Sequence, residues 1–231
     1  MNSTEKKSFI ARPSTWIGLV VAIVVVIAAG FGGLKWYTAK ENSSADAAFE
    51  AASSGTALED LNGSWTIAEG SQAGYRVGKT QAGQEVVVTA RTSDVTGEIT
   101  IANDELAAGS EVTVDLTTVA SDSAQRDEHF RTGILETDTY PTATFTTTEA
   151  VSVENLKTDG VATVTVPGTL NIHGVEKPVS IEMNISNNDG VVTVIGNSTL
   201  TWTDFGVTPP TMPGMAVHDT GDIEFSLTLE K

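Results

Sequence analysis

Residues 111–118 (EVTVDLTT) alternate strictly between apolar and polar side chains, which places Val112, Val114 and Leu116 on one face. A period of two is typical of a half-buried antiparallel strand. Comparable alternation or β-rich composition recurs at residues 84–92, 95–102, 143–148, 161–172, 179–185, 192–202 and 223–229. The pattern predicts about eight or nine strands.

Turn residues separate these runs. Asn188-Asp189-Gly190 predicts a hairpin, Asp159-Gly160 a turn before a strand, and residues 172–175 (IHGV) a tight reversal. The exception is residues 121–135, where Ser121 or Asp122 can cap a helix of two to three turns. Many strands with one short helix predict an all-β fold.

The size of the β-rich part favours a closed barrel over a sandwich. Some 170 residues on eight or nine strands suit an eight-stranded antiparallel barrel, which is wide enough to hold one small ligand. A sandwich stays open as the alternative. Pairing of the first strand (residues 65–77) with the last (residues 223–229) would decide for the closed barrel.

Residues 16–34 (WIGLVVAIVVVIAAGFGGL) form an uninterrupted apolar run. As a helix it would span about 28 Å, close to the thickness of a bilayer core. Lys6, Lys7 and Arg12 precede it, which predicts a cytoplasmic N-terminus (residues 1–15) and an exported C-terminal part. A cleaved signal peptide is the alternative, but its apolar region is usually shorter.

Residues 35–62 are rich in Ala, Ser, Glu and Asp and predict a flexible tether. The barrel is then expected over residues 63–231. We therefore expect a single-pass protein of the cytoplasmic membrane whose C-terminal domain lies outside the cytoplasm.

Charge is divided unevenly between these parts. The chain of 231 residues has 13 basic and 30 acidic residues, a net charge of -17. Residues 1–60 hold 5 basic and 6 acidic groups (-1), so residues 61–231 hold 8 and 24 (-16). A domain this acidic repels nucleic-acid phosphates, so nucleic-acid binding is not expected. The absence of cysteine excludes disulfides, thiolate metal sites and thiol catalysis.

Candidate catalytic and metal-binding residues form no recognisable arrangement. His129, His173 and His218 lack the spacing of a metal site, and no G-x-S-x-G nucleophile motif occurs. We expect no catalytic residue, metal or cofactor. Residues 126–131 (RDEHFR) form the densest polar cluster, which either pins the helix to the barrel rim or binds a polar head group through Arg126, Arg131 or His129. Residues 207–215 (VTPPTMPGM) are either a cover for an opening or a rigid connector.

Motifs in the expected order resemble the YceI-like family of exported lipid- or polyisoprenoid-binding proteins. The matching pieces are residues 65–67 (WTI), 74–77 (GYRV), 95–97 (VTG), 126–130 (RDEHF), 140–145 (YPTATF), 168–175 (GTLNIHGV), 178–179 (PV) and 204–207 (DFGV). They cover nearly all of the exported domain. The chain departs from the family pattern at Gly78-Lys79, where many relatives carry a histidine, and at Thr203, where an arginine is usual.

The resemblance implies a lipocalin-like extended antiparallel barrel whose apolar lumen takes a long prenyl chain. The expected ligand is a polyisoprenoid, a quinone or another lipid, bound without catalysis by a carrier. Alternatives are a structural or stress-related interaction module with a packed barrel, and a lipid-modifying enzyme. Expected ligand contacts are Tyr75, Val114, Arg126, His129, Phe130, Phe145, Met183, Trp202 and Phe205. The sequence indicates neither the oligomeric state nor a protein partner.

Overall fold

The computed structural model describes residues 48–231. The predicted cytoplasmic N-terminus, the predicted transmembrane helix (residues 16–34) and the first half of the predicted tether lie outside this part, so they stay predictions. Among residues 48–231, no helix combines the length and the apolar composition needed to cross a bilayer.

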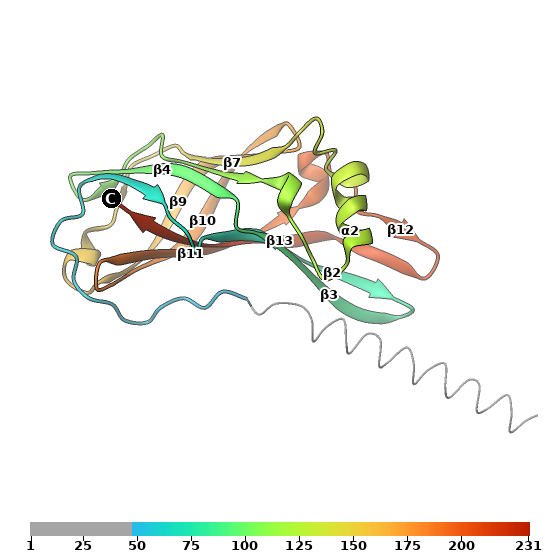
Figure 1. Ribbon diagram of the computed structural model, residues 1–231, viewed down its shortest axis with the longest axis horizontal. Helices are drawn as coiled ribbons and strands as arrows, with labels where there is room; N and C mark the ends of the chain where they lie inside the picture. The colour runs from blue at the N-terminus through green and yellow to red at the C-terminus, as the bar shows by residue number, and fades with distance from the viewer. Residues whose placement is uncertain (1–47) are drawn as a thin grey trace, which may run out of the picture. The chain divides into compact units, whose positions relative to one another are not determined.

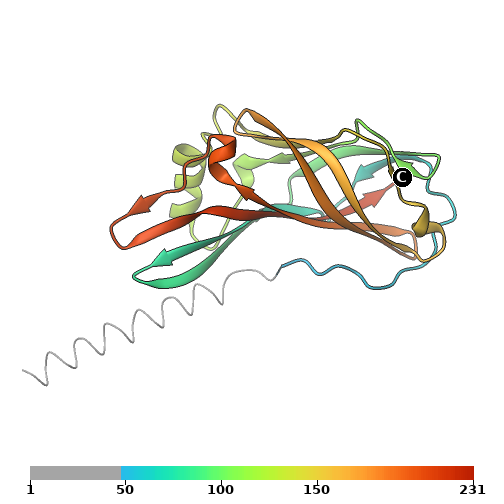
Figure 2. The same ribbon diagram turned by 180° about the vertical axis from the view of Figure 1, so that it is seen from behind.

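Eight antiparallel strands close into a barrel (Figures 1 and 2). In spatial order they are β1 (Gly63–Ile67), β4 (Val95–Ala102), β6 (Glu111–Asp115), β7 (Thr142–Thr147), β9 (Val161–Ile172), β10 (Val175–Asn188), β11 (Val191–Thr201) and β13 (Met215–Glu230), which pairs again with β1. The predicted all-β barrel of about eight strands is confirmed.

The first predicted strand, residues 65–77, is in fact two strands. β1 pairs with β4 and with the end of β13, whereas β2 (Gln72–Gln81) pairs with the first part of β13 and with β3 (Gln84–Thr92). Between β1 and β2 the Ser71 hydroxyl donates to the Ala68 carbonyl and accepts from the Thr228 amide. These bonds stabilise the break between β1 and β2. Because of this break, β1 pairs with the end of β13 while β2 pairs with its first part. Both halves pair with the last strand, as a closed barrel requires.

Short elements cover the two ends of the barrel. At one end lie α2 (Ala124–His129), the π-helical turn η2 (Phe130–Ile134), η4 (Trp202–Phe205) and β12 (Thr211–Met212), beside the β2–β3 hairpin (Figure 1). The other short elements are β5 (Glu105–Leu106), η1 (Leu116–Thr118), β8 (Val151–Ser152) and η3 (Glu154–Lys157). We call the first end the helical end.

Local side-chain bonds correct two sequence predictions. The strand predicted to run to Thr118 stops at Asp115, because the Asp115 carboxylate accepts from the Thr117 amide and caps the turn η1. The predicted helix begins at Ala124 instead of Ser121, because the Ser123 hydroxyl accepts from the Arg126 amide. Each side chain satisfies an amide that the first turn leaves without a backbone partner.

The predicted turns have the backbone that they require. Asp189 and Gly190 have φ of 53° and 93°, and His173 and Gly174 have 54° and 73°. Two successive residues with positive φ make the type I′ turn that matches the twist of a two-residue hairpin. These turns fix the registers of β10 against β11 and against β9.

Residues 48–62 lie against the barrel and are not the flexible coil predicted from composition. The Thr56 amide donates to the Asn187 carbonyl (2.7 Å), and the Leu58 amide donates to the Leu156 carbonyl (2.9 Å). Leu61 is fully buried, and its carbonyl accepts from the Trp65 indole. We call residues 48–62 the strap; it runs along the barrel in both views (Figures 1 and 2).

Candidate ligand-binding cavity

The barrel encloses an elongated cavity of about 320 Å³. This volume lies at the lower end of the range typical of small-molecule sites. Pro209, Met215 and Val217 line it at the helical end, and Leu61 and Trp65 line it at the opposite end. The cavity therefore follows the barrel along its length.

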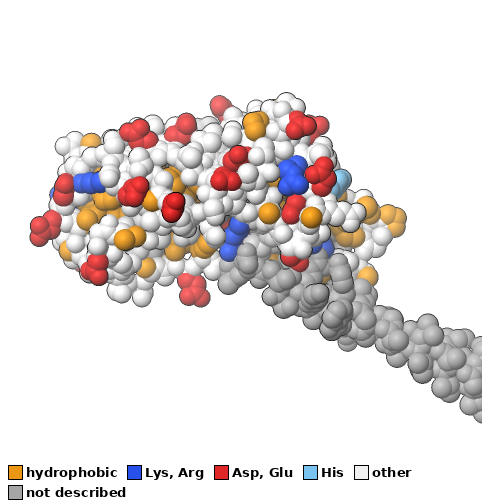
Figure 3. Space-filling view, viewed as in Figure 1, with side chains coloured by type: hydrophobic (Ala, Val, Ile, Leu, Met, Phe, Trp, Pro, Cys, Tyr) orange, Lys and Arg blue, Asp and Glu red, His pale blue; other side chains and the backbone are white. Residues whose placement is uncertain are grey.

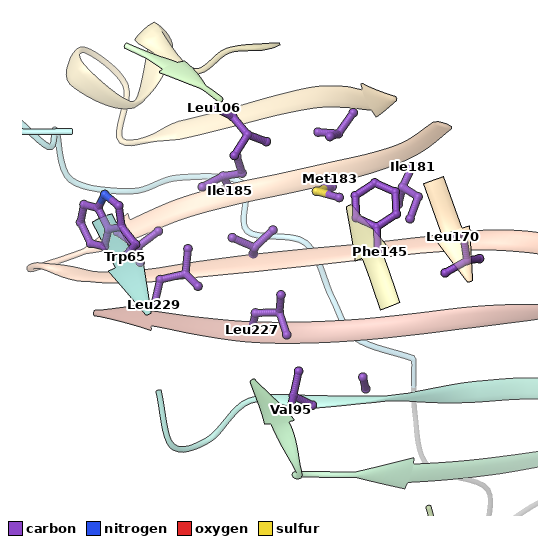
Figure 4. Close-up of a cluster of buried hydrophobic side chains, with 14 of the residues drawn as sticks. Trp65, Val95, Leu106, Phe145, Leu170, Ile181, Met183, Ile185, Leu227 and Leu229 are labelled. Atoms are coloured by element: carbon purple, nitrogen blue, oxygen red, sulfur yellow. The ribbon is translucent and has the colours of Figure 1, made fainter. Parts of the chain in front are cut away.

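Alternating residues of the long strands form the cavity wall. Ile181, Met183 and Ile185 of β10 face the lumen, as do Leu227 and Leu229 of β13. Figure 4 shows these side chains directed toward those of Trp65, Leu106, Phe145 and Leu170 from other strands. Because the wall is almost entirely apolar, the cavity suits a hydrocarbon chain and offers little to a polar solute.

Three aromatic rings lie over inward-facing glycines of neighbouring strands. A Cβ added at Gly168 would lie 2.4 Å from the Phe145 ring, and one at Gly196 would lie 2.4 Å from the Phe225 ring. One at Gly221 would lie 2.6 Å from the Trp202 ring. The missing side chains let the rings lie close to the barrel wall, which leaves the lumen open.

Aromatic side chains gather where the cavity reaches the helical end. The rings of Tyr75 and Phe130 stack with centroids 5.1 Å apart, and Trp202 meets Tyr75 edge to face at 6.5 Å. Burial raises the pKa of Tyr75 to about 12, against a smaller opposite effect of the Arg126 guanidinium. The phenol therefore stays protonated at neutral pH and keeps its ability to donate a hydrogen bond.

Basic side chains border the same end of the cavity. Arg126, His129 and Lys79 all line it, and Lys79 is buried. Arg126 pairs with Asp122 at 2.5 Å and donates to the Ser121 hydroxyl at 3.1 Å. The Arg126 and Lys79 side chains give this end of the cavity a polar character, whereas the rest of the wall is apolar.

The other charged residues of the 126–131 cluster hold the helix in place. The Asp127 carboxylate accepts from the amide and the hydroxyl of Ser121, at 2.9 and 2.6 Å. Arg131 pairs with Glu128 at 3.2 Å on the surface and does not line the cavity. The cluster therefore divides: its Asp127 and Arg131 stabilise the helix, while Arg126 and His129 also face the cavity.

The structure brings most of the predicted site residues together. Tyr75, Val114, Arg126, His129, Phe130, Phe145, Met183 and Trp202 line the one cavity. Phe205 does not; it is 2% exposed, lies in η4 and packs in the hydrophobic core. That these residues contact a ligand stays a prediction.

Sequence reasoning missed two contributions to the site. Leu58 and Leu61 of the strap line the cavity, although their segment reads as a tether. A signal was present, since they are the only leucines in a segment otherwise made mostly of small and polar residues. Gly168, Gly196 and Gly221 were also missed, because their role depends on which strand lies beside them.

The three histidines form no cluster, and two of them each face a single carboxylate. His173 lies 3.3 Å from Glu136, and His218 lies 3.0 Å from Glu85. Within residues 48–231, no three His, Cys, Asp or Glu side chains are grouped as metal ligands. The expectation that the protein needs no metal stays a prediction.

Comparison with known proteins identifies one family. Residues 65–229 match the model of the YceI-like domain. A UPF0312 protein of Vibrio parahaemolyticus is 42% identical over 72 residues, which are 31% of this chain and 35% of that protein. Protein YceI of Escherichia coli O157:H7 is 39% identical over 75 residues, or 32% and 36% of the two chains. The matched segment thus spans about a third of the length of these curated relatives.

Solved structures share the fold at lower identity. A polyisoprenoid binding domain from Saccharophagus degradans, implicated in plant cell wall breakdown, has a TM-score of 0.58 at 19% identity, covering 72% of this chain and 97% of that one. A Campylobacter jejuni YceI protein has a TM-score of 0.51 at 20% identity, covering 62% and 84%. At this level of identity the likeness concerns the fold.

Proposed function

Since the chain belongs to the YceI-like family, we propose that it is a noncatalytic binding or carrier protein for a long-chain isoprenoid or similar amphiphilic lipid. The observation that carries this proposal is the elongated apolar cavity inside the barrel. A barrel built only for stability would be filled with side chains to the density of a protein core.

An isoprenoid chain matches the chemistry of the wall. It has no group that requires a hydrogen bond, and the wall offers mainly Val, Ile, Leu, Met and aromatic side chains. Burying apolar area yields about 25 cal/mol per Å², so a few hundred Å² would contribute several kcal/mol before the cost of association. The polyisoprenoid-binding domain of S. degradans, which shares the fold, supports the same ligand class.

The charged end of the cavity supports an orientation for such a ligand. A phosphate or quinone head would lie near Arg126, His129 and Lys79, and the neutral Tyr75 phenol would donate a hydrogen bond. The apolar tail would extend toward Trp65 and the strap. Arg126 keeps its ion pair with Asp122 in this arrangement, so the head group shares a cation that is already held in position.

We place this activity at the outer face of the cytoplasmic membrane. The support is the apolar run at residues 16–34 with Lys6, Lys7 and Arg12 before it. The acidic domain would be repelled by anionic lipid, so an anchor would keep it close to a ligand dissolved in the bilayer.

The proposal is tested by identifying what co-purifies with the full chain. We expect organic extraction followed by mass spectrometry to recover a prenyl lipid, and native mass spectrometry to show its mass on the protein. Met183→Trp would fill the middle of the lumen and should abolish co-purification, while Met183→Leu, which conserves volume, should retain it.

Two results would contradict the carrier function. One is a native mass equal to that of the bare chain even after incubation with a polyprenyl phosphate or an isoprenoid quinone. The other is equal lipid recovery from Met183→Trp and Met183→Leu, which would place the lipid outside the lumen. Either result would favour the alternative of a structural or interaction module.

A further inference from the structure

The helical end of the barrel carries an uncharged protruding segment. Residues 205–217 (FGVTPPTMPGMAV) contain no charged side chain, although residues 61–231 together carry a net charge of -16. This segment runs from the last residue of η4 through β12 to the beginning of β13. We call residues 207–217 the tip.

The tip exposes apolar side chains to solvent. Met212 is 57% exposed, the highest value for a large hydrophobic residue in the part of the chain that the structure describes. Pro213 beside it is exposed as well. Figure 3 shows hydrophobic side chains gathered at this end of the domain, whereas acidic side chains are spread over the barrel surface. An exposed apolar cluster of this kind typically marks a binding surface.

Hydrogen bonds hold the tip in a fixed shape. The Val217 amide donates to the Pro210 carbonyl at 3.1 Å, which closes the hairpin between β12 and β13. The Ala82 amide donates to the Gly214 carbonyl at 2.7 Å, which joins the tip to the β2–β3 turn. The apolar groups are therefore presented by a structured edge.

The tip is continuous with the cavity. Val207, Pro209, Met215 and Val217 line the lumen from the same segment that exposes Met212. Arg126 borders the cavity at this end, and its positive charge favours contact with lipid phosphates. A surface that is apolar at its edge, uncharged along its length and cationic behind it is complementary to the interfacial region of a phospholipid bilayer.

We propose that the tip docks on a phospholipid bilayer, so that a lipid passes between the membrane and the lumen at the helical end without crossing water. This inference rests on the proposed lipid-carrier function for its purpose, but the docking contact is measurable without any ligand. Residues 188–191 at the opposite hairpin provide the matched control: Val191 is 52% exposed but follows Asp189 in a polar turn.

The absence of native cysteine allows a direct test. The full-length variants Met212→Cys and Val191→Cys would each be labelled with an environment-sensitive fluorophore and reconstituted with phosphatidylcholine vesicles. We expect a spin label carried on the lipid chains to quench the probe at residue 212 at least about threefold more than the probe at residue 191, since only the first would lie in the interface.

Every outcome of this comparison decides the docking proposal. Equal quenching at the two positions, or none at either, would overturn it. Shielding of residue 212 from an aqueous quencher without quenching by the lipid label would point to a protein partner or a second copy, and would overturn it too.

A charge variant separates docking from ligand binding. Met212→Asp should slow transfer of a fluorescent polyprenyl lipid out of vesicles about tenfold, because it places a charge in the interface, while detergent-solubilised lipid should still load the cavity normally. Loss of loading in the unmodified chain would refute the carrier function and leave the quenching result valid. If Met212→Asp loads normally and transfers lipid at the same rate as the unmodified chain, docking is refuted and the carrier function is not.

Discussion

The Tyr75 ring stacks on the Phe130 ring, with centroids 5.1 Å apart, and thereby joins the β2 strand to the helical turn at one end of the cavity. Tyr75 lies on the strand that pairs with β13, whereas Phe130 follows directly after α2. The contact therefore positions the helical cover relative to the barrel wall.

Phe130→Ala should reduce the free energy of unfolding by about 2 kcal/mol, because it removes an aromatic pair and part of the apolar packing. It should also accelerate hydrogen exchange in residues 124–134. Phe130→Leu keeps most of the buried area and should cost about half as much. A loss of stability without faster exchange in this segment would show that the stack does not hold the helix.

A buried carboxylate holds the β2–β3 hairpin to β13. Glu224 is 5% exposed; it pairs with Arg91 at 2.6 Å and with Arg76 at 3.3 Å. Glu224→Gln should cost about 3 kcal/mol, because it removes the buried negative charge that both guanidinium groups contact. Chemical denaturation would measure this, with the exposed Glu230→Gln expected to change stability by less than about 0.5 kcal/mol. Equal effects would contradict a structural role for this ion pair.

Local sequence patterns predicted the bounds of several strands, but they did not predict the contacts between segments far apart in the chain. The strand at residues 161–172 was predicted to the residue, because alternation and the adjoining Gly160 turn are both local signals. The break between β1 and β2 was missed, because it depends on a bond between Ser71 and Thr228, 157 residues apart. The pairing of Arg91 with Glu224 was likewise inaccessible, since the register of three strands determines it.

In the candidate site, too, local patterns predicted some positions and missed those that depend on long-range contacts. Inward positions such as Val114 and Met183 followed from alternation, and both line the cavity. Phe205 was expected beside them, but η4 interrupts the alternation and buries its ring in the core. Composition suggested that the strap would be flexible, because most of its residues are small or polar and its two leucines were not assigned to a hydrophobic lumen.

Gly168 is expected to tolerate no larger side chain. A Cβ there would lie 2.4 Å from the Phe145 ring, so Gly168→Ala should force the ring into the lumen. We expect a loss of about 1–3 kcal/mol in stability and a lower capacity for lipid. Adding Phe145→Leu should restore part of both, since the smaller side chain removes the contact with the ring but not the 2.7 Å approach to the Thr146 carbonyl oxygen. Additive losses in the double variant would contradict this explanation.

Asn187 fastens the strap to the barrel. Its side-chain amide donates to the Thr56 carbonyl at 2.7 Å, and its side-chain oxygen accepts from the Gly190 amide at 2.9 Å. Asn187→Ala should cost about 2 kcal/mol and increase hydrogen exchange and proteolysis within residues 48–62. Asn188→Ala, at an exposed neighbouring position, should leave both unchanged. An unaltered strap in the first variant would mean that Leu58 and Leu61 hold it without these bonds.

The buried phenol of Tyr75 predicts a specific loss of stability at high pH. Burial raises its pKa from 10.0 to about 12, so between these values the unfolded chain releases this proton while the folded chain retains it. The contribution of Tyr75 to stability is therefore fully present below pH 10 and is lost as the pH rises to about 12. Tyr75→Phe should flatten this part of the stability profile and remove the late phase of the tyrosinate absorbance titration. Tyr140→Phe, which leaves Tyr75 in place, should retain that phase. Titration of every tyrosine in a single early phase would contradict the burial of this hydroxyl, and a ligand that shields it should delay the phase further.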